Sequence, residues 1–182
     1  MSDLSIRVAG ATQTPEDGFD NKKGAIIRVT PAIHAASSTD NDVMCLTTEI
    51  PKAVNKRGGV SRLVNIGWSV KQLLTLNLDV IIMQVSKDFT DAAGNACNIS
   101  DDDLVAAKVC AALRLEKPVP IGLNGNEYYN YSEGGNEYNG QFPIMLQAEP
   151  DSTSVYFTVI DRDGGDTFTA SDLTFAFHIE YL

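Results

Sequence analysis

The chain has 182 residues, 43% of them hydrophobic, and a formal net charge of −10 at pH 7. A chain of this length and composition suits one globular domain with a sizeable core, which excludes disorder throughout. The negative charge argues against sequence-independent binding to DNA or RNA, because phosphate contacts require a clustered positive surface.

The sequence lacks the signals of membrane insertion and export. No apolar run reaches the roughly 18 residues of a membrane span, and the first residues, MSDLSIRVAG, lack the pattern of a secretory signal. Cys45, Cys97 and Cys110 have no metal-ligand spacing and cannot all pair. We therefore expect a protein made in the cytoplasm, with no membrane partner, whose cysteines are buried thiols.

Residues 1–23 are expected to form an N-terminal arm, and residues 24–182 a single domain. The arm is polar and rich in turn-forming residues, apart from a short apolar group at residues 4–8. Seven runs rich in Val, Ile, Phe, Tyr and Thr then lie between clusters of Gly, Asn, Asp and Pro, at residues 25–30, 43–50, 63–70, 78–86, 142–149, 154–160 and 173–182. Short strands at this density predict an all-β sandwich or barrel.

One helix is predicted within NISDDDLVAAKVCAALRL, residues 98–115. Ser100 can cap its N-terminus, Asp103 stands at the third position of a capping box, and Asp101 and Asp102 complement the helix dipole. Helix capping explains the acidic triplet without a metal ion. Successive helical residues project about 100° apart, so the three carboxylates would not converge on one ion.

Residues 116–141 form a long insert rich in Tyr, Gly and Asn, in which GNEY occurs at 125–128 and 135–138. The two copies are either the arms of a hairpin turning at SEGG, with exposed tyrosines, or parts of a solvated loop whose tyrosines lie back on the body. Tyrosine gives rigid contact area with a polar end, which favours interfaces with proteins or sugars. The candidate interface residues are Tyr128, Tyr129, Tyr131 and Tyr138.

The stretch IDRDGGDTFTASD, residues 160–172, resembles a calcium loop only in part. Asp161, Asp163 and Asp172 fall at positions 1, 3 and 12 of an EF-hand window, but Gly165 replaces the oxygen ligand at position 5 and Asp166 replaces the glycine at position 6. The flanking runs alternate as strands do. A connection between two strands is therefore predicted, with no metal.

No catalytic or cofactor motif is found. His34 and His178 have no partner pattern for metal binding or nucleophilic catalysis, and phosphate-binding loops, serine elbows and zinc-helix motifs are absent. A diffuse pair among carboxylates such as Glu49, Asp79 and Glu149 remains open as a glycosidase hypothesis. Trp68, the only tryptophan, is expected to fill the core instead of stacking on a sugar.

Several stretches, in their order, resemble the jelly-roll structural proteins carried on the heads of tailed bacteriophages. They are VMCLTTEIPKAVNKRGGVSRLVNIGW, LDVIIMQVSKDF with NISDDDL following, and SVYFTVIDRDGGDTFTASDLTFAFHIEYL. The resemblance covers roughly residues 24–115 and 142–182, and leaves the arm and the tyrosine-rich insert without a counterpart. It implies a jelly-roll β-sandwich that is not an enzyme and carries no cofactor.

The resemblance further implies a capsid decoration, or cement, protein that binds the major capsid protein on the virion surface. A homotrimer is expected, partly because phage heads offer three-fold positions that a matching oligomer can occupy. The arm is then expected to order on the capsid surface. The alternatives are a glycan-binding head-fibre or host-adhesion module using the tyrosines and Trp68, and the hydrolase named above.

Overall fold

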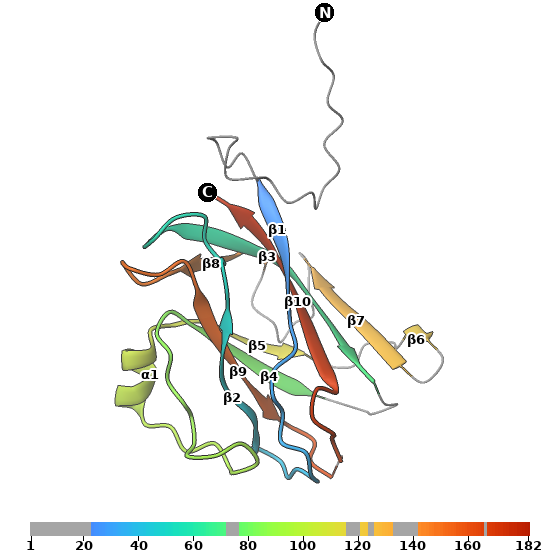
Figure 1. The fold of residues 1–182 in the computed structure, drawn as a ribbon. Helices are drawn as coiled ribbons and strands as arrows, with labels where there is room; N and C mark the ends of the chain where they lie inside the picture. The colour runs from blue at the N-terminus through green and yellow to red at the C-terminus, as the bar shows by residue number, and fades with distance from the viewer. Residues whose placement is uncertain (1–22, 72–76, 116–120, 124–125, 133–141, 166) are drawn as a thin grey trace, which may run out of the picture.

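The computed structural model of the chain describes residues 23–71, 77–115, 121–123, 126–132, 142–165 and 167–182, with the backbone alone for 121–123 and 126–132. Its strands are β1 (Gly24–Val29), β2 (Val43–Ile50), β3 (Val60–Val70), β4 (Leu78–Met83), β5 (Val109–Leu115), β6 (Ile121–Leu123), β7 (Asn126–Ser132), β8 (Ile144–Gln147), β9 (Val155–Asp161) and β10 (Leu173–Tyr181). One helix, α1 (Asp101–Ala107), lies between β4 and β5 (Figure 1). All seven predicted strands are confirmed.

The strands pair in a nested order that makes the chain one long antiparallel hairpin. β1 pairs with β10, β2 with β9 and β3 with β8, and β4 and β5 form the innermost pair. Two further antiparallel pairings, β3 with β10 and β4 with β9, roll this hairpin into two sheets. Nested pairs rolled in this way are the double Greek key of a jelly roll, so the predicted fold class is confirmed.

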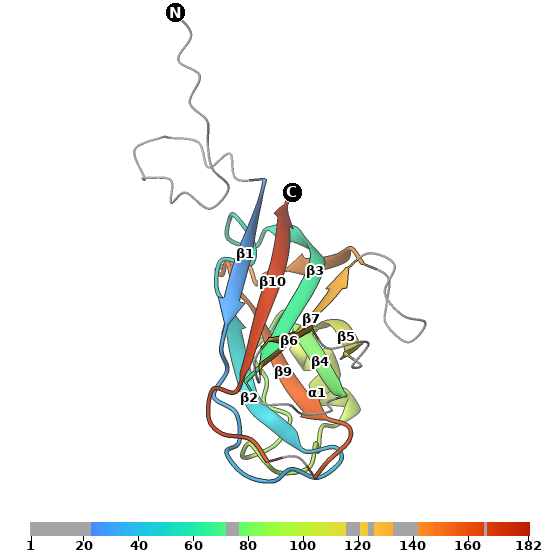
Figure 2. The same cartoon turned by 90° about the vertical axis from the view of Figure 1, so that its right-hand side faces the viewer.

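The two sheets pack face to face (Figures 1 and 2). The six-stranded sheet has the order β1-β10-β3-β7-β6, with β8 also paired to β3, and the four-stranded sheet has the order β2-β9-β4-β5. β3 serves two partners on one edge, because β8 pairs with its first half and β7 with its second half. The segment between β5 and β8 therefore adds β7 and β6 to a sheet that the nested order alone would leave with four strands.

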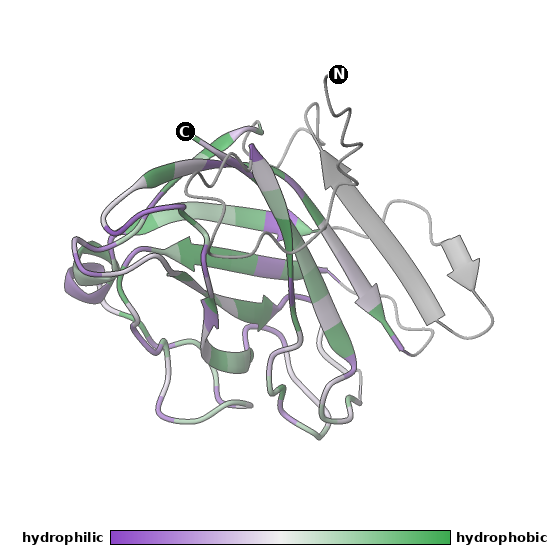
Figure 3. Cartoon of the chain, turned by 45° about the horizontal axis from the view of Figure 1, so that its top comes forward, coloured by the Kyte–Doolittle hydropathy of each residue, from purple (hydrophilic) through white to green (hydrophobic). Residues whose placement is uncertain are grey.

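The core between the sheets centres on three phenylalanines. Phe157 of β9 packs edge-on against Phe175 and Phe177 of β10, with ring centroids 5.4 and 5.1 Å apart. Trp68 is fully buried in the same cluster, as the sequence predicts. Figure 3 shows hydrophobic residues recurring along the strands that enclose this core. Period-two alternation in β9 and β10 thus places the aromatic side chains inside.

A second, smaller core covers the outer face of the four-stranded sheet. Met83 and Ile160 lie on that face, and the long connection from β4 to β5 folds over them, contributing Phe89 and Ala107. α1 belongs to this connection and lies beside the sheet (Figure 1). No described segment covers the outer face of the six-stranded sheet in the same way.

The predicted helix is correct at its start and wrong at its end. Ser100 caps α1, and both hydrogen bonds of the capping box with Asp103 are present. The helix stops after Ala107 because Lys108 takes a left-handed conformation, with φ of 51°. Val109–Leu115, assigned to the helix from its alanines, is strand β5, since pairing with β4 overrides a weak helix propensity.

The insert contains a hairpin that neither alternative from the sequence describes. β6 and β7 pair with each other, whereas the turn considered at SEGG, residues 132–135, falls mostly outside the described residues. Glu127 and Tyr128 pair with β6 on one edge and with β3 on the other. The second GNEY copy, residues 135–138, lies outside the described residues, so its pairing stays a prediction.

Replacing Phe157 with alanine is expected to lower the free energy of unfolding by about 3–5 kcal/mol, because it removes the ring that joins the two sheets and leaves a cavity. Denaturant unfolding measures the loss. Val105→Ala is the matched control, since Val105 is 77% exposed and should change stability by no more than about 0.5 kcal/mol. Equal, small losses in both variants would contradict this account of the core.

Candidate functional site

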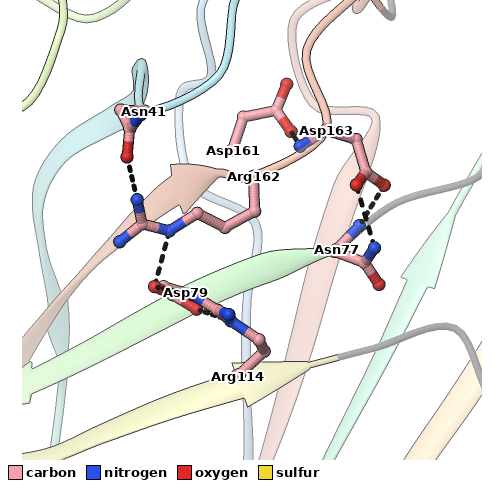
Figure 4. Close-up of polar contacts among 7 residues, drawn as sticks. All are labelled: Asn41, Asn77, Asp79, Arg114, Asp161, Arg162 and Asp163. Atoms are coloured by element: carbon pink, nitrogen blue, oxygen red, sulfur yellow. Dashed lines mark hydrogen bonds and ion pairs between the residues drawn. The ribbon is translucent and has the colours of Figure 1, made fainter.

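A cluster of polar side chains lies at one end of the sandwich, beside the β1–β2 and β9–β10 connections (Figure 4). Figure 4 shows the side chains that form it: Asn41, Asn77, Asp79, Arg114, Asp161, Arg162 and Asp163. They come from six separate elements or connections, and the fold brings them together.

Asp79 of β4 is the centre of the cluster. Its carboxylate accepts hydrogen bonds from Arg114 Nε at 2.9 Å and Nη2 at 3.2 Å, and from Arg162 Nε at 2.6 Å. Burial alone would raise the pKa of this carboxyl, but the hydrogen bonds and positive charges of the two arginines together lower the pKa below its usual value. Arg162 is held in turn by Asn41. A carboxylate held by two arginines in this way stabilises the fold and is not available as a general acid or base.

The aspartates considered as calcium ligands in the β9–β10 connection accept hydrogen bonds from within the protein. Asp161 is fully buried, and its two carboxylate oxygens accept from the Ser38 hydroxyl and from the backbone N–H of Asp163 at 3.0 Å. Asp163 binds the backbone and side chain of Asn77, at 3.0 and 2.9 Å. Asp172 instead accepts from Thr169. The three aspartates therefore accept hydrogen bonds from different donors within the protein.

A glycine allows this connection to pack closely. Gly164 has φ of +66°, and a Cβ at this position would lie 2.6 Å from the backbone nitrogen of Asp40. The next residues are tied to the β1–β2 connection by hydrogen bonds from Gly165 N to Ser38 O, at 2.8 Å, and from Phe168 N to Ala36 O, at 3.3 Å. The predicted strand-to-strand connection is confirmed, with Asp and Gly supplying the turns. No group of three metal-ligating side chains occurs among the described residues.

The three carboxylates considered for a glycosidase have separate partners. Glu49 accepts from the Ser154 hydroxyl at 2.5 Å, and Glu149 pairs with Lys108 at 3.2 Å. Asp79 is held by the two arginines described above. Nothing in these contacts joins two of the three into an acid–base pair.

The two histidines lie in unrelated places. His178 is partly buried on the outer row of β10, as predicted; burial and the neighbouring charge of Arg28 lower its pKa. His34 lies in the β1–β2 connection, where its backbone donates to Met44 and its ring packs against Gly94. Neither contact indicates catalysis.

All three cysteines are free thiols. Burial raises the pKa of Cys45 to about 12, and burial also raises the pKa values of Cys97 and Cys110. Cys45 is fully buried as predicted, whereas Cys97 and Cys110 are half-buried. Raised pKa values keep these groups as thiols, which are poor nucleophiles and poor metal ligands.

The tyrosines singled out from the sequence are placed only in part. Tyr128, Tyr129 and Tyr131 lie in β7, aligned with Ser69, Trp68 and Ile66 of β3. Their side chains, and Tyr138 entirely, are outside the described residues. The interface prediction therefore stays a prediction.

Sequence reasoning missed an open depression of about 500 Å³ beside the end of α1. Its lining includes Arg57 and Gly58 of the RGG turn together with Lys108 and Gln84. Lys108 is paired with Glu149, and Gln84 Nε2 donates to the Ala148 carbonyl at 2.9 Å.

No protein family model matches the chain, and no curated protein sequence matches it significantly. Within the described ranges, no helix is long and apolar enough to cross a lipid bilayer.

Replacing Asp79 with asparagine is expected to lower the free energy of unfolding by about 1–3 kcal/mol at pH 7, because two arginines lose a charged acceptor. The folded-state pKa of Asp79 is lowered, so its stabilisation is present above the unfolded-state pKa and is lost as pH falls through the folded-state value. The difference between wild type and variant should therefore shrink below about pH 4. Asp151→Asn, at an exposed position, is the control. A difference that stays constant down to pH 2 would contradict this role.

Calcium is expected to leave the melting temperature unchanged, with or without a chelator, because the oxygens of Asp161 and Asp163 already accept hydrogen bonds within the protein. A cation that bound the folded state would raise the melting temperature. Differential scanning fluorimetry at millimolar calcium makes the measurement. A rise of several degrees that disappears in Asp163→Asn would show that the connection does hold the ion.

Proposed function

We propose that the protein is a virion structural protein that decorates the outside of a tailed-phage head and binds its major capsid protein. The single observation that carries this proposal is the nested strand order, β1-β10-β3-β8 facing β2-β9-β4-β5, because it is the architecture that the resemblance in the sequence implies. Fold alone does not assign function. The proposal therefore also rests on the chemistry of the described surface.

The chemistry of the described residues supports binding over catalysis. Asp79, Glu49, Glu149 and Asp161 each contact their own cation, hydroxyl or backbone donor. Among the described residues, the shifted pKa values belong to Asp79 and Asp103, which pair with cations, to the three thiols and to His178. A catalytic site would need at least one such group directed at a substrate position. We propose that the protein is not an enzyme and needs no cofactor.

The outer face of the six-stranded sheet suits contact with a large protein partner. The outer face of the six-stranded sheet exposes Ile26 and Met145, which are 50% and 51% exposed, beside Arg28, Arg62 and Glu180. Mixed apolar and charged positions of this kind suit moderate contacts repeated many times on a capsid lattice. Self-association as a trimer would let every subunit make an equivalent contact at a three-fold position. The arm and the tyrosines of the insert are the candidate contact regions.

The proposed location is the virion surface after synthesis in the host cytoplasm. Three free cysteines agree with assembly in a reducing compartment, where thiols persist.

Purified protein is expected to sediment as a trimer and to pellet with emptied heads built from the major capsid protein of the same genome. Analytical ultracentrifugation measures the first property, and co-sedimentation measures the second. Binding should saturate and should be competed by unlabelled protein.

Two variants separate the candidate contact regions. Removal of residues 1–22 should weaken co-sedimentation, whereas Tyr128→Ala should alter contacts made by the insert, and the exposed change Val105→Asp serves as a control away from both. A stable monomer that never pellets with heads would contradict the proposal. Binding to a glycan array that is abolished by alanine at Tyr128, Tyr129 and Tyr131 would favour the adhesion alternative instead.

A further inference from the structure

The six-stranded sheet ends at β1 with an edge to which no described residue is hydrogen-bonded. β1 pairs with β10 on its other side, and the first strand of a sheet normally has its open edge covered or blunted. The open edge of β2 differs, because Val43 exchanges backbone hydrogen bonds with Gly94 and Asn95, and Thr47 binds Asp88. Among the described strands, β1 therefore offers an uncovered edge directly after the arm.

The interior row of β1 is incompletely covered. Ala25, Ile27 and Val29 are only half-buried, although Ile27 and Val29 pack against the main core. Their register partners in β10 are Ile179, Phe177 and Phe175, all of them buried. At these three positions the core residues of β10 are buried, whereas those of β1 are still partly exposed to solvent. One additional strand with apolar residues at alternate positions would cover them.

The arm contains a segment with that pattern. In LSIRV, residues 4–8, Leu4, Ile6 and Val8 alternate with Ser5 and Arg7, so a strand would present three apolar side chains on one face and polar ones on the other. We propose that residues 4–8 dock as an added strand on the free edge of β1 in the same chain. This proposal is independent of any capsid.

The tether favours the chain's own edge over that of a neighbour. A random-coil chain of fifteen residues has an end-to-end distance of roughly 20 Å, so a tether with the length of residues 9–23 is long enough for the segment to reach either end of β1. Such a tether holds the segment at a local concentration of the order of millimolar. A strand from another copy would have to compete with that concentration. Self-docking is therefore the stronger equilibrium for purified protein.

Charge selects the direction of the added strand. The antiparallel register that aligns Ile6 with Ile27 places Ser5 beside Arg28 and Arg7 beside Ile26. The aliphatic stem of Arg7 would then cover Ile26, which is 50% exposed. The parallel alignment of the same two isoleucines would place Arg7 beside Arg28, and like charges directly opposite one another destabilise a sheet. The docked strand is antiparallel.

Hydrogen exchange of the β1 amides, followed residue by residue by NMR, tests the proposal. Ile6→Asp should accelerate exchange of the outward-facing amides of β1 at least tenfold, because the strand that protects them no longer docks. Thr12→Asp adds the same charge within the tether and should leave their exchange unchanged. Near-UV circular dichroism from the buried Trp68 verifies that the core is intact.

A second experiment, with a truncated chain and an added peptide, tests the proposal if the Ile6→Asp variant aggregates. A chain that lacks residues 1–10 should show fast exchange in β1, and adding a peptide of residues 1–10 should restore protection in proportion to its occupancy. Identical exchange in wild type, Ile6→Asp and the truncated chain would overturn the proposal. Protection in the wild type that falls on dilution would overturn it too, since it would show that a neighbour donates the strand.

Discussion

The contact of Phe157 with Phe175 and Phe177 is the interaction on which the rest of the structure depends. Phe157 belongs to the four-stranded sheet and the other two rings belong to the six-stranded sheet, so these rings join the two layers of the sandwich. The nested pairing of strands brings β9 and β10 into different sheets, and without a shared core each sheet would expose one apolar face to water. Backbone pairing sets the order of the strands, and these rings make that order stable.

Polar residues at the ends of the sandwich hold the connections on this frame. Asp79 draws Arg114 and Arg162 together, while Asp161 and Asp163 tie the β9–β10 connection to Ser38 and Asn77. These contacts use the carboxylates that a catalytic or calcium site would need. Among the described residues, the outer face of the six-stranded sheet stays exposed, and it is the surface on which the proposed binding role rests.

The sequence predicted the strands well because each carries its own local signal. The alternation in residues 173–182 and the apolar run at residues 78–86 predict strands whatever the arrangement of the sheets. β5 was missed because its alanines suit a helix, and only pairing with β4 and the left-handed Lys108 decide otherwise. The Asp79 cluster was beyond sequence reasoning, since Arg114 and Arg162 reach Asp79 from distant parts of the chain. The start of α1 was predictable because a capping box is a local pattern.

We propose that this jelly roll acts as a binding unit on the outside of a phage head. Cryo-electron microscopy of heads before and after saturation with the protein tests it most directly. The account predicts added density on the outer surface at three-fold or quasi-three-fold positions, with three copies of the sandwich in each. Heads that show no added density at saturating protein would contradict the claim.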